Sequence, residues 1–440
     1  MATGQCLDRS LVMLAVLTTL IFLGCLALIF AGKLHRTITA VSGAVVMVGL
    51  GLAFGFYGEE AAIAAIDFQT IGLLLGMMVL VSLLEPTGFF TYLAIRVGRW
   101  ARGDPVRLLV LLGTVTTILS LFLDNVTTVV LIAPVTVLIC ELLDVSPAPF
   151  LMAEALLSDT GGVGTLVGDP PNVLIGSAAG LSFQAFLTHA LPVVAVVWLL
   201  AVVLLLYLFR AELAQRPADG QVIQKLDLSK ALDDPIVARR VLVVLGVIVG
   251  LFFVHHLIHL SPAFIALAGA AVALVWVRPD VSKTLAQIEW SVLIFFMALF
   301  VMVGGLEAAG VFDWVAGLLT GAGRFHPVWL GLVTIWLVAL LSAIIDNVPI
   351  TIALIPVLQG MAENGVNVTP LWWALVFGAG FGGNGTIIGS TANIVAVSLS
   401  ERTRAPITAA LWSRRGLPVM VMACAVTSLL YVLFFAWFQR

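Results

Sequence analysis

Long apolar runs, separated by short polar segments, dominate the chain. A helix needs ~20 apolar residues to cross a bilayer. Uninterrupted runs that match or approach this length lie at 11–31, 188–209, 241–254 and 416–438. Further apolar helices are expected at about 37–57 and 67–85, and a short amphipathic stretch at 87–102 is expected to lie along the membrane surface. The pattern predicts an all-α polytopic membrane protein.

Two apolar segments carry a polar motif at their centres. Segment 105–143 contains Ser120-Leu-Phe-Leu-Asp-Asn-Val-Thr-Thr128. Segment 327–362 contains Ser342-Ala-Ile-Ile-Asp-Asn-Val-Pro-Ile350, which begins 222 residues after the first motif. Non-helical backbone at membrane depth is tolerated only where protein or water covers it. A polar break at mid-membrane therefore favours a re-entrant helical hairpin in each segment.

Two other apolar segments are broken by glycine. Segment 149–180 contains Gly162-Val-Gly-Thr-Leu-Val-Gly-Asp-Pro-Pro-Asn172, and segment 370–399 contains Gly383-Asn-Gly-Thr-Ile-Ile-Gly-Ser-Thr-Ala-Asn393. Gly and Pro weaken or break a continuous helix. We expect two half-helices joined by an unwound loop in each segment, that is, a broken transmembrane helix.

These matching motifs indicate an internal duplication. Residues 1–210 form the first repeat, residues 211–239 form a charged linker, and residues 240–440 form the second repeat. Five full crossings in each repeat is an odd number, so the second repeat is expected to be inverted in the membrane. Inverted repeats with interrupted segments at corresponding positions indicate a transporter whose substrate and ion site lies at the interruptions.

Composition and charge support this interpretation. Hydrophobic residues make up 61% of the chain and charged residues only 10%, whereas soluble domains carry about 25% charged residues. If alternate loops lie on opposite sides, one side receives all of the 21 Lys and Arg residues except Arg9, Arg324 and Arg440. The positive-inside rule makes that side cytoplasmic. The sequence thus predicts a multi-pass protein of the inner (cytoplasmic) membrane with a cytoplasmic linker at 211–239, surrounded by the lipid bilayer.

The basic residues are scattered loop anchors, so no nucleic-acid partner is expected. The four cysteines are far apart and lack the spacing of a metal or redox site. No P-loop is present, so this chain is not expected to hydrolyse ATP. No cofactor and no resident metal is therefore predicted.

Asp124 and Asp346 are the strongest candidates for chemistry. An ionisable residue at membrane depth is costly and is a functional candidate by default. Both could also cap the returning helix of their hairpin, and a residue can do both. We expect them to carry protons together with Asp159, which lies beside the first unwound loop. Asp169 precedes two prolines and is interpreted as a turn residue.

The motifs Leu123-Asp-Asn-Val-Thr-Thr128 with Pro134, Gly164-Thr-Leu-Val-Gly-Asp-Pro-Pro-Asn172, and Gly382-Gly-Asn-Gly-Thr-Ile-Ile-Gly389 with Asn393 resemble the ion transporter superfamily. Within it, the sequence is most similar to the branch of arsenite efflux pumps, sodium–proton antiporters and the melanosomal P protein. The resemblance implies a homodimer and an elevator-like movement of the hairpins and broken helices.

In the related sodium–dicarboxylate carriers, each hairpin tip carries Ser-Asn-Thr, whose Ser and Asn bind sodium, and a second Ser lies four residues earlier. Both tips here have Asp in place of the first Ser, which favours proton coupling over sodium-coupled dicarboxylate uptake. The residues themselves and this resemblance together give the candidate substrate- and ion-binding residues: Ser120, Asp124, Asn125, Thr128, Thr165, Gly168, Asn172, Ser342, Asp346, Asn347, Asn384, Thr386, Gly389 and Asn393.

The resulting hypothesis is a proton-coupled secondary transporter that exports arsenite or antimonite in exchange for protons. An alternative is a sodium (or lithium)–proton antiporter, in which Asp124, Asn125, Asp346 and Asn347 would hold sodium transiently. A further alternative is an anion or carboxylate carrier, or a channel. An enzyme is not expected, because the inverted repeat explains the pair of Asp residues without a catalytic dyad. The expected partners are a small inorganic solute and protons, and a separate ATPase subunit remains an alternative.

Overall fold

The computed structural model describes residues 2–30, 34–215, 228, 231–255, 257–312 and 326–439, without the side chains of residues 2–12 and 30. Most of the predicted linker, the side chain of Arg9, and residues Arg324 and Arg440 lie outside the described part. Every regular element in these ranges is a helix, as the sequence predicts.

The first repeat consists of twelve helical elements. They are α1 (Ala2–Phe30), α2 (Arg36–Phe54), α3 (Glu59–Ala64), α4 (Phe68–Leu84), η1 (Glu85–Thr87), α5 (Phe89–Ala101), α6 (Pro105–Ser120), α7 (Asn125–Leu142), α8 (Ala148–Gly162), α9 (Pro170–Ala179), α10 (Phe183–Leu208) and α11 (Arg210–Leu213).

The second repeat follows the same order, and its first helix, α12, begins at Pro235, within the linker predicted at 211–239. It comprises α12 (Pro235–Val254), α13 (Pro262–Val277), α14 (Val281–Ala286), α15 (Trp290–Ala308), α17 (Pro327–Ile344), α18 (Asn347–Glu363), α19 (Thr369–Gly382), η5 (Gly383–Gly385), η6 (Ile387–Gly389), α20 (Thr391–Ser400), α21 (Ala409–Leu433) and α22 (Phe435–Phe438).

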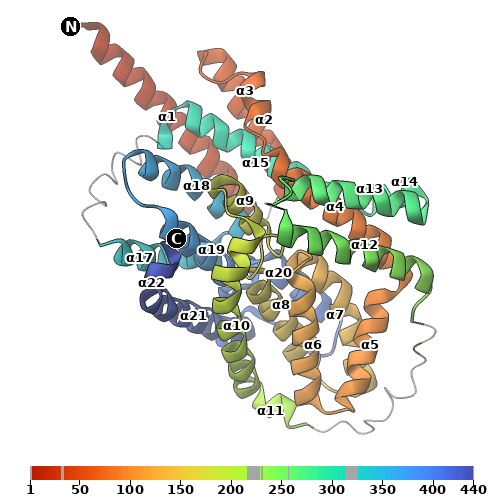
Figure 1. Cartoon of the computed structure of the whole chain (residues 1–440). Coiled ribbons are helices and arrows are strands. Elements are labelled where there is room, and N and C mark those ends of the chain that lie inside the picture. The colour runs from red at the N-terminus through yellow and green to blue at the C-terminus, as the bar shows by residue number, and fades with distance from the viewer. Residues whose placement is uncertain are drawn as a thin grey trace.

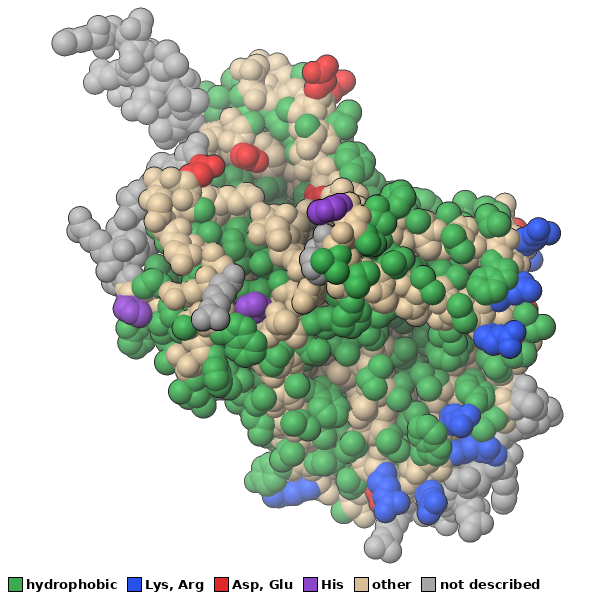
Figure 2. Space-filling view, in the orientation of Figure 1, with side chains coloured by type: hydrophobic (Ala, Val, Ile, Leu, Met, Phe, Trp, Pro, Cys, Tyr) green, Lys and Arg blue, Asp and Glu red, His purple; other side chains and the backbone are tan. Residues whose placement is uncertain are grey.

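Within the described ranges, eight helices are long and apolar enough to cross a membrane. Hydrophobic side chains cover most of the face in Figure 2, whereas Lys and Arg gather along its right and lower edges. The exposed acidic side chains on this face lie mainly at its top. This distribution fits a multi-pass membrane protein with one basic side.

Each repeat contains a hairpin and a broken helix. The hairpins are α6–α7 and α17–α18, and the broken helices are α8–α9 and α19–α20. Packing follows the duplication: α6 packs on α8 as α17 packs on α19, and α2 packs on α15 as α13 packs on α4. The predicted fold class, two inverted repeats that each hold a hairpin and a broken helix, is confirmed.

Local sequence signals explain where these helices begin. Asp67 and Asp104 precede α4 and α6, and each side chain accepts hydrogen bonds from the next free backbone amides. Proline at the first helical position follows in α6, α12 and α13, where its missing N–H group costs nothing. The first residue of each returning hairpin helix, α7 and α18, is likewise preceded by a capping Asp.

The helices form two packed groups (Figure 1). The crossed-helix unit consists of α1, α2, α4, α12, α13 and α15, and the hairpin unit consists of the two hairpins, the two broken helices, α10 and α21. Within the hairpin unit, α7 packs on α20 and α18 packs on α9, so each returning hairpin helix contacts the broken helix of the other repeat. The units meet where α15 packs on α18, α4 packs on α9 and α10 packs on α12.

Candidate functional site

Both Asp residues at the hairpin tips cap a helix. The Asp124 carboxylate accepts a hydrogen bond from the Thr127 backbone N at 2.9 Å and another from the Thr127 hydroxyl. The Asp346 carboxylate accepts one from the Val348 backbone N at 3.2 Å. Both side chains also line a cavity. Capping by both residues is confirmed, and their place in a cavity is compatible with the proton-carrying role predicted for them.

Equivalent hydroxyl groups attach each tip to the broken helix of its own repeat. Ser120 Oγ donates to the Ser158 backbone oxygen at 2.9 Å, and Ser342 Oγ donates to the Ala379 oxygen at 2.7 Å. Both serines are fully buried. They hold the hairpins in place and do not line the cavity.

The candidate Thr and Asn residues of the unwound loops satisfy backbone groups. The hydroxyls of Thr165 and Thr386 donate to backbone oxygens of the hairpins, and each accepts a hydrogen bond from a glycine N at 3.1 Å. Asn172 donates to two backbone oxygens of its loop at 2.7 and 3.0 Å, and Asn393 does the same at 2.9 and 3.0 Å. Non-helical backbone inside a membrane requires such partners. The side chains of these four residues therefore stabilise the unwound loops.

Gly168 and Gly389 lie where backbone segments approach closely. A Cβ atom on Gly168 would lie 2.6 Å from the backbone oxygens of both Ser120 and Gly162, and one on Gly389 would lie 2.6 Å from the Gly383 oxygen. Real Cβ atoms do not come this close to another heavy atom. Glycine is therefore needed at both positions for the loop to pass the hairpin.

Two buried carboxylates of the first broken segment connect the repeats. Asp159 Oδ1 accepts hydrogen bonds from Asn125 Nδ2 at 2.7 Å and from Ser390 Oγ at 2.9 Å. Asp169 accepts from Asn347 Nδ2 at 3.0 and 3.3 Å. The two Asp side chains are each 1% exposed, so these amide and hydroxyl donors take the place of water.

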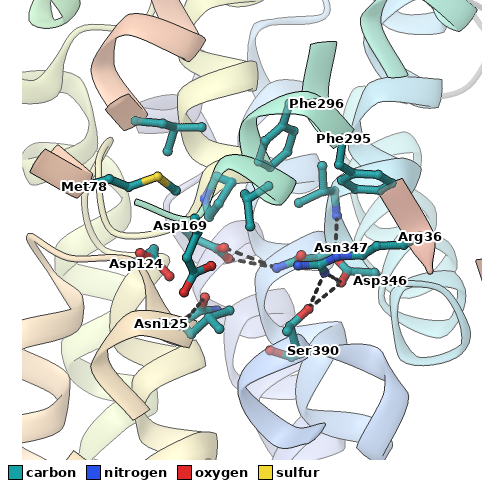
Figure 3. Close-up of a pocket in the computed structure, with 17 residues that line it drawn as sticks. Arg36, Met78, Asp124, Asn125, Asp169, Phe295, Phe296, Asp346, Asn347 and Ser390 are labelled. Atoms are coloured by element: carbon teal, nitrogen blue, oxygen red, sulfur yellow. Dashed lines mark hydrogen bonds and ion pairs between the residues drawn. The ribbon is translucent and has the colours of Figure 1, made fainter. Parts of the chain in front are cut away.

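Asp169 lies in the bend that precedes α9, as interpreted, but its side chain has a further contact. Its side chain makes no capping hydrogen bond to α9, although it occupies the N-cap position. It faces the hairpin of the second repeat, as the contact with Asn347 shows (Figure 3). A partner 178 residues away in the sequence leaves no local signal.

Asn384 and Thr128 lie behind the cavity. Asn384 Nδ2 donates to Thr160 Oγ1 at 3.1 Å, and Thr128 Oγ1 donates to the Asp124 backbone oxygen at 2.9 Å. In the described part of the chain, the buried atoms Asn384 Oδ1, Asn393 Oδ1 and Asp159 Oδ2 have no hydrogen-bond partner. The two amide oxygens can only accept hydrogen bonds, whereas the carboxyl oxygen can also carry a proton.

The cavity itself lies between the two hairpin tips and the crossed-helix unit. Its volume is about 40 Å³. Polar residues of the hairpin unit form one wall, and apolar side chains of α4 and α15 form the other (Figure 3). The lining residues that carry polar side chains are Arg36, Asp124, Asn125, Asp169, Glu289, Asp346, Asn347, Ser390 and Thr391.

Four carboxyl groups and one guanidinium thus line the cavity. Of the candidate residues, it brings together the Asp-Asn pairs of the two hairpins, Asp124-Asn125 and Asp346-Asn347. The sequence interpretation missed Arg36 and Glu289, which both looked like ordinary residues at helix starts. Across the described residues, no group of three His, Cys, Asp or Glu side chains has the geometry of a metal site.

Comparison with known proteins agrees with this architecture. The family model described as citrate transporter (CitMHS) matches residues 26–378. A 46 kDa membrane protein of Mycobacterium leprae is 37% identical over 426 residues, which cover 94% of this chain and 98% of that protein. An uncharacterized transporter of Mycobacterium tuberculosis is 37% identical over 424 residues, which cover 94% of this chain and 97% of that protein.

More distant relatives extend the comparison. The human P protein is 31% identical over 494 residues, which cover 93% of this chain and 59% of that longer protein, so the similarity to P protein predicted from the motifs is confirmed. The Alcanivorax borkumensis YdaH transporter has the same fold, with a TM-score of 0.60 at 15% identity over 96% of this chain and 98% of that chain. The chain is therefore a transporter, not an enzyme, and it belongs to the citrate transporter (CitMHS) family.

Proposed function

We propose that this protein is a proton-coupled secondary transporter that exports arsenite or antimonite in exchange for protons. One observation carries the proposal: Asp124, Asp169 and Asp346 line a single cavity where the tips of two inverted hairpins meet. Carboxyl groups with restricted access to water are suitable proton carriers. Asp159, hydrogen-bonded to Asn125 directly behind this cavity, extends the group.

The donor set favours a neutral, oxygen-bearing cargo. Arsenite is a small neutral triol at neutral pH. The amides of Asn125 and Asn347 and the hydroxyls of Ser390 and Thr391 can donate to or accept from such hydroxyl groups. A neutral cargo also avoids the repulsion that the cavity carboxylates would exert on an anion.

A carboxylate carrier is the second candidate. The family description and the Arg36 guanidinium in the cavity favour it, since a guanidinium binds carboxylates through paired hydrogen bonds. A sodium (or lithium)–proton antiporter would use the same hairpin tips, with the metal ion and the proton alternating at the Asp-Asn pairs.

The cycle that we propose moves the hairpin unit against the crossed-helix unit, in a homodimer of the inner membrane with the 211–239 linker in the cytoplasm. The charge rule places the starts of α2 and α15 on the cytoplasmic side. Arg36 and Glu289 at these starts line the cavity, which supports a cytoplasm-facing arrangement.

Flux in proteoliposomes with an imposed pH gradient tests the proposal. The wild type, Asp124→Asn and Asp346→Asn are compared with arsenite, citrate, sodium and lithium. We expect proton-driven arsenite flux that both variants lose. Citrate flux, or proton release on adding sodium or lithium without arsenite flux, would replace the cargo assignment. Because the vesicles contain this chain alone, flux without ATP also tests whether an ATPase subunit is needed.

A further inference from the structure

Arg36 occupies an unusual position for a cation. It is the first residue of α2, where the helix dipole disfavours positive charge. Its side chain is nevertheless only 29% exposed, and the guanidinium lies 5.4 Å from the centre of the Phe295 ring of α15. A side chain held inward against its own helix dipole needs compensating contacts elsewhere.

Those contacts lie on the hairpin unit. Arg36 Nη1 donates to Thr391 Oγ1 at 2.7 Å and lies 3.6 Å from Asp346 Oδ2. Thr391 Oγ1 in turn donates to the same Asp346 oxygen at 3.0 Å. The three side chains form a closed triangle that joins α2 to the second hairpin tip and to the start of α20; Figure 3 labels Arg36 and Asp346.

The start of α2, which carries Arg36, is bonded to α15. Thr37, the next residue, donates from Oγ1 to the Ser291 backbone oxygen at 2.8 Å, which ties the start of α2 to α15. Ala40 and Met47 of α2 are fully buried. Arg36 therefore extends from a helix start that is bonded to α15, and the triangle adds a polar link between the two units.

The first hairpin tip lacks such a link. In the described residues, Asp124 is bonded locally by Thr127 and forms no ion pair. The start of α13, which is equivalent to the start of α2, carries Ser261 and Pro262 in place of a basic residue. The link thus acts at one tip and at one end of the cavity.

We propose that Arg36 is a positioning residue that latches the empty carrier in this arrangement by occupying the place of a cation at Asp346. This inference rests on the proposed movement of the hairpin unit. A proton or metal ion that arrives at Asp346 displaces the guanidinium and frees the hairpin unit. Because the empty carrier stays latched, it does not return unloaded, and the transporter exchanges solutes without leaking them.

Cross-linking measures the latch independently of the cargo. Met78 of α4 and Val126 of α7 line the same small cavity from the two units, so a cysteine pair at these positions in a cysteine-free background reports this arrangement through mercury cross-linking. We expect Arg36→Gln to lower the cross-linking rate roughly tenfold, as for the loss of one charge-assisted contact. Arg36→Lys keeps the charge and should retain most of the rate. The exposed Arg107, outside the cavity, provides the control Arg107→Gln, which should leave the rate unchanged.

Asp346→Asn completes the test. It should lower the rate as much as Arg36→Gln does, and the double variant should show no further loss. In proteoliposomes, Arg36→Gln should raise the efflux that proceeds without a counter-solute. A cross-linking rate within twofold of wild type in Arg36→Gln would overturn the latch, whatever the cargo. If Arg36→Gln lowers the cross-linking rate but the protein moves no arsenite, the inference stands and only the proposed cargo is refuted.

Discussion

Removing the Ser390 hydroxyl should show whether the buried Asp159 carboxyl group is charged. Ser390 Oγ donates to Asp159 Oδ1 at 2.9 Å, and Asn125 Nδ2 donates to the same oxygen at 2.7 Å. Ser390→Ala removes one of these two donors and leaves the other in place. Since Asp159 is 1% exposed, water cannot readily replace the lost hydroxyl.

The charge state sets the magnitude. A hydrogen bond to a charged group contributes about 1.5–3 kcal/mol to stability, and one between neutral groups about 0.5–1.5 kcal/mol. A double-mutant cycle with Ser390→Ala and Asp159→Ala, each of which removes the hydrogen bond, isolates this pair from unrelated effects of either substitution. A coupling free energy of about 2 kcal/mol indicates a charged carboxylate, and one near 1 kcal/mol a protonated group.

Reversible unfolding of the purified protein in mixed micelles, followed by circular dichroism, supplies the four free energies of unfolding. Ser82→Ala is the matched control, because Ser82 is equally buried but donates only within its own helix, to the Val79 oxygen at 2.8 Å. Repeating the cycle from pH 5 to pH 8 shows where the coupling changes. A coupling below about 0.5 kcal/mol at every pH would refute the contact itself.

Three further predictions follow from the same geometry. Gly168→Ala should abolish transport and lower the melting temperature, because its Cβ would lie 2.6 Å from two backbone oxygens. The control Gly49→Ala, whose Cβ would meet nothing within 4 Å, should change neither property. Flux and thermal unfolding measure the two effects. Lys283→Cys should react with a membrane-impermeant maleimide only from the cytoplasm, and Glu60→Cys only from outside. Comparing the labelling of intact cells with that of inverted vesicles tests this. Equal labelling of both variants in the two preparations would refute the orientation. Asn347→Ala should reduce flux at least tenfold, since it leaves a buried carboxylate without its donor at a cost of about 1–3 kcal/mol; unchanged flux would remove Asn347 from the site.

The duplication explains what sequence reasoning could predict. A polar break in an apolar run is a local feature, and its recurrence 222 residues later gave the hairpins and broken helices without any tertiary information. The same reasoning failed where the decisive partner is remote. Asp169 stands before two prolines, and only the folded chain places Asn347 beside it. Arg36 looked like a membrane-surface anchor, because nothing near it in the sequence points to Asp346.

The two repeats differ at the buried carboxyl groups behind and within the cavity. At the offset of 221 residues that relates the broken segments, Asp159 corresponds to Gly380 and Asp169 to Ser390, so both buried carboxylates come from the first repeat. Asn125 and Asn347 are equivalent by the duplication, and yet each donates to one of these carboxylates. Both hairpin tips are thereby bonded to the same broken segment. A tip that shifts relative to this segment must change the hydrogen bonds of a buried carboxyl group, so the proton coupling that we propose can act on the position of the tips within the hairpin unit.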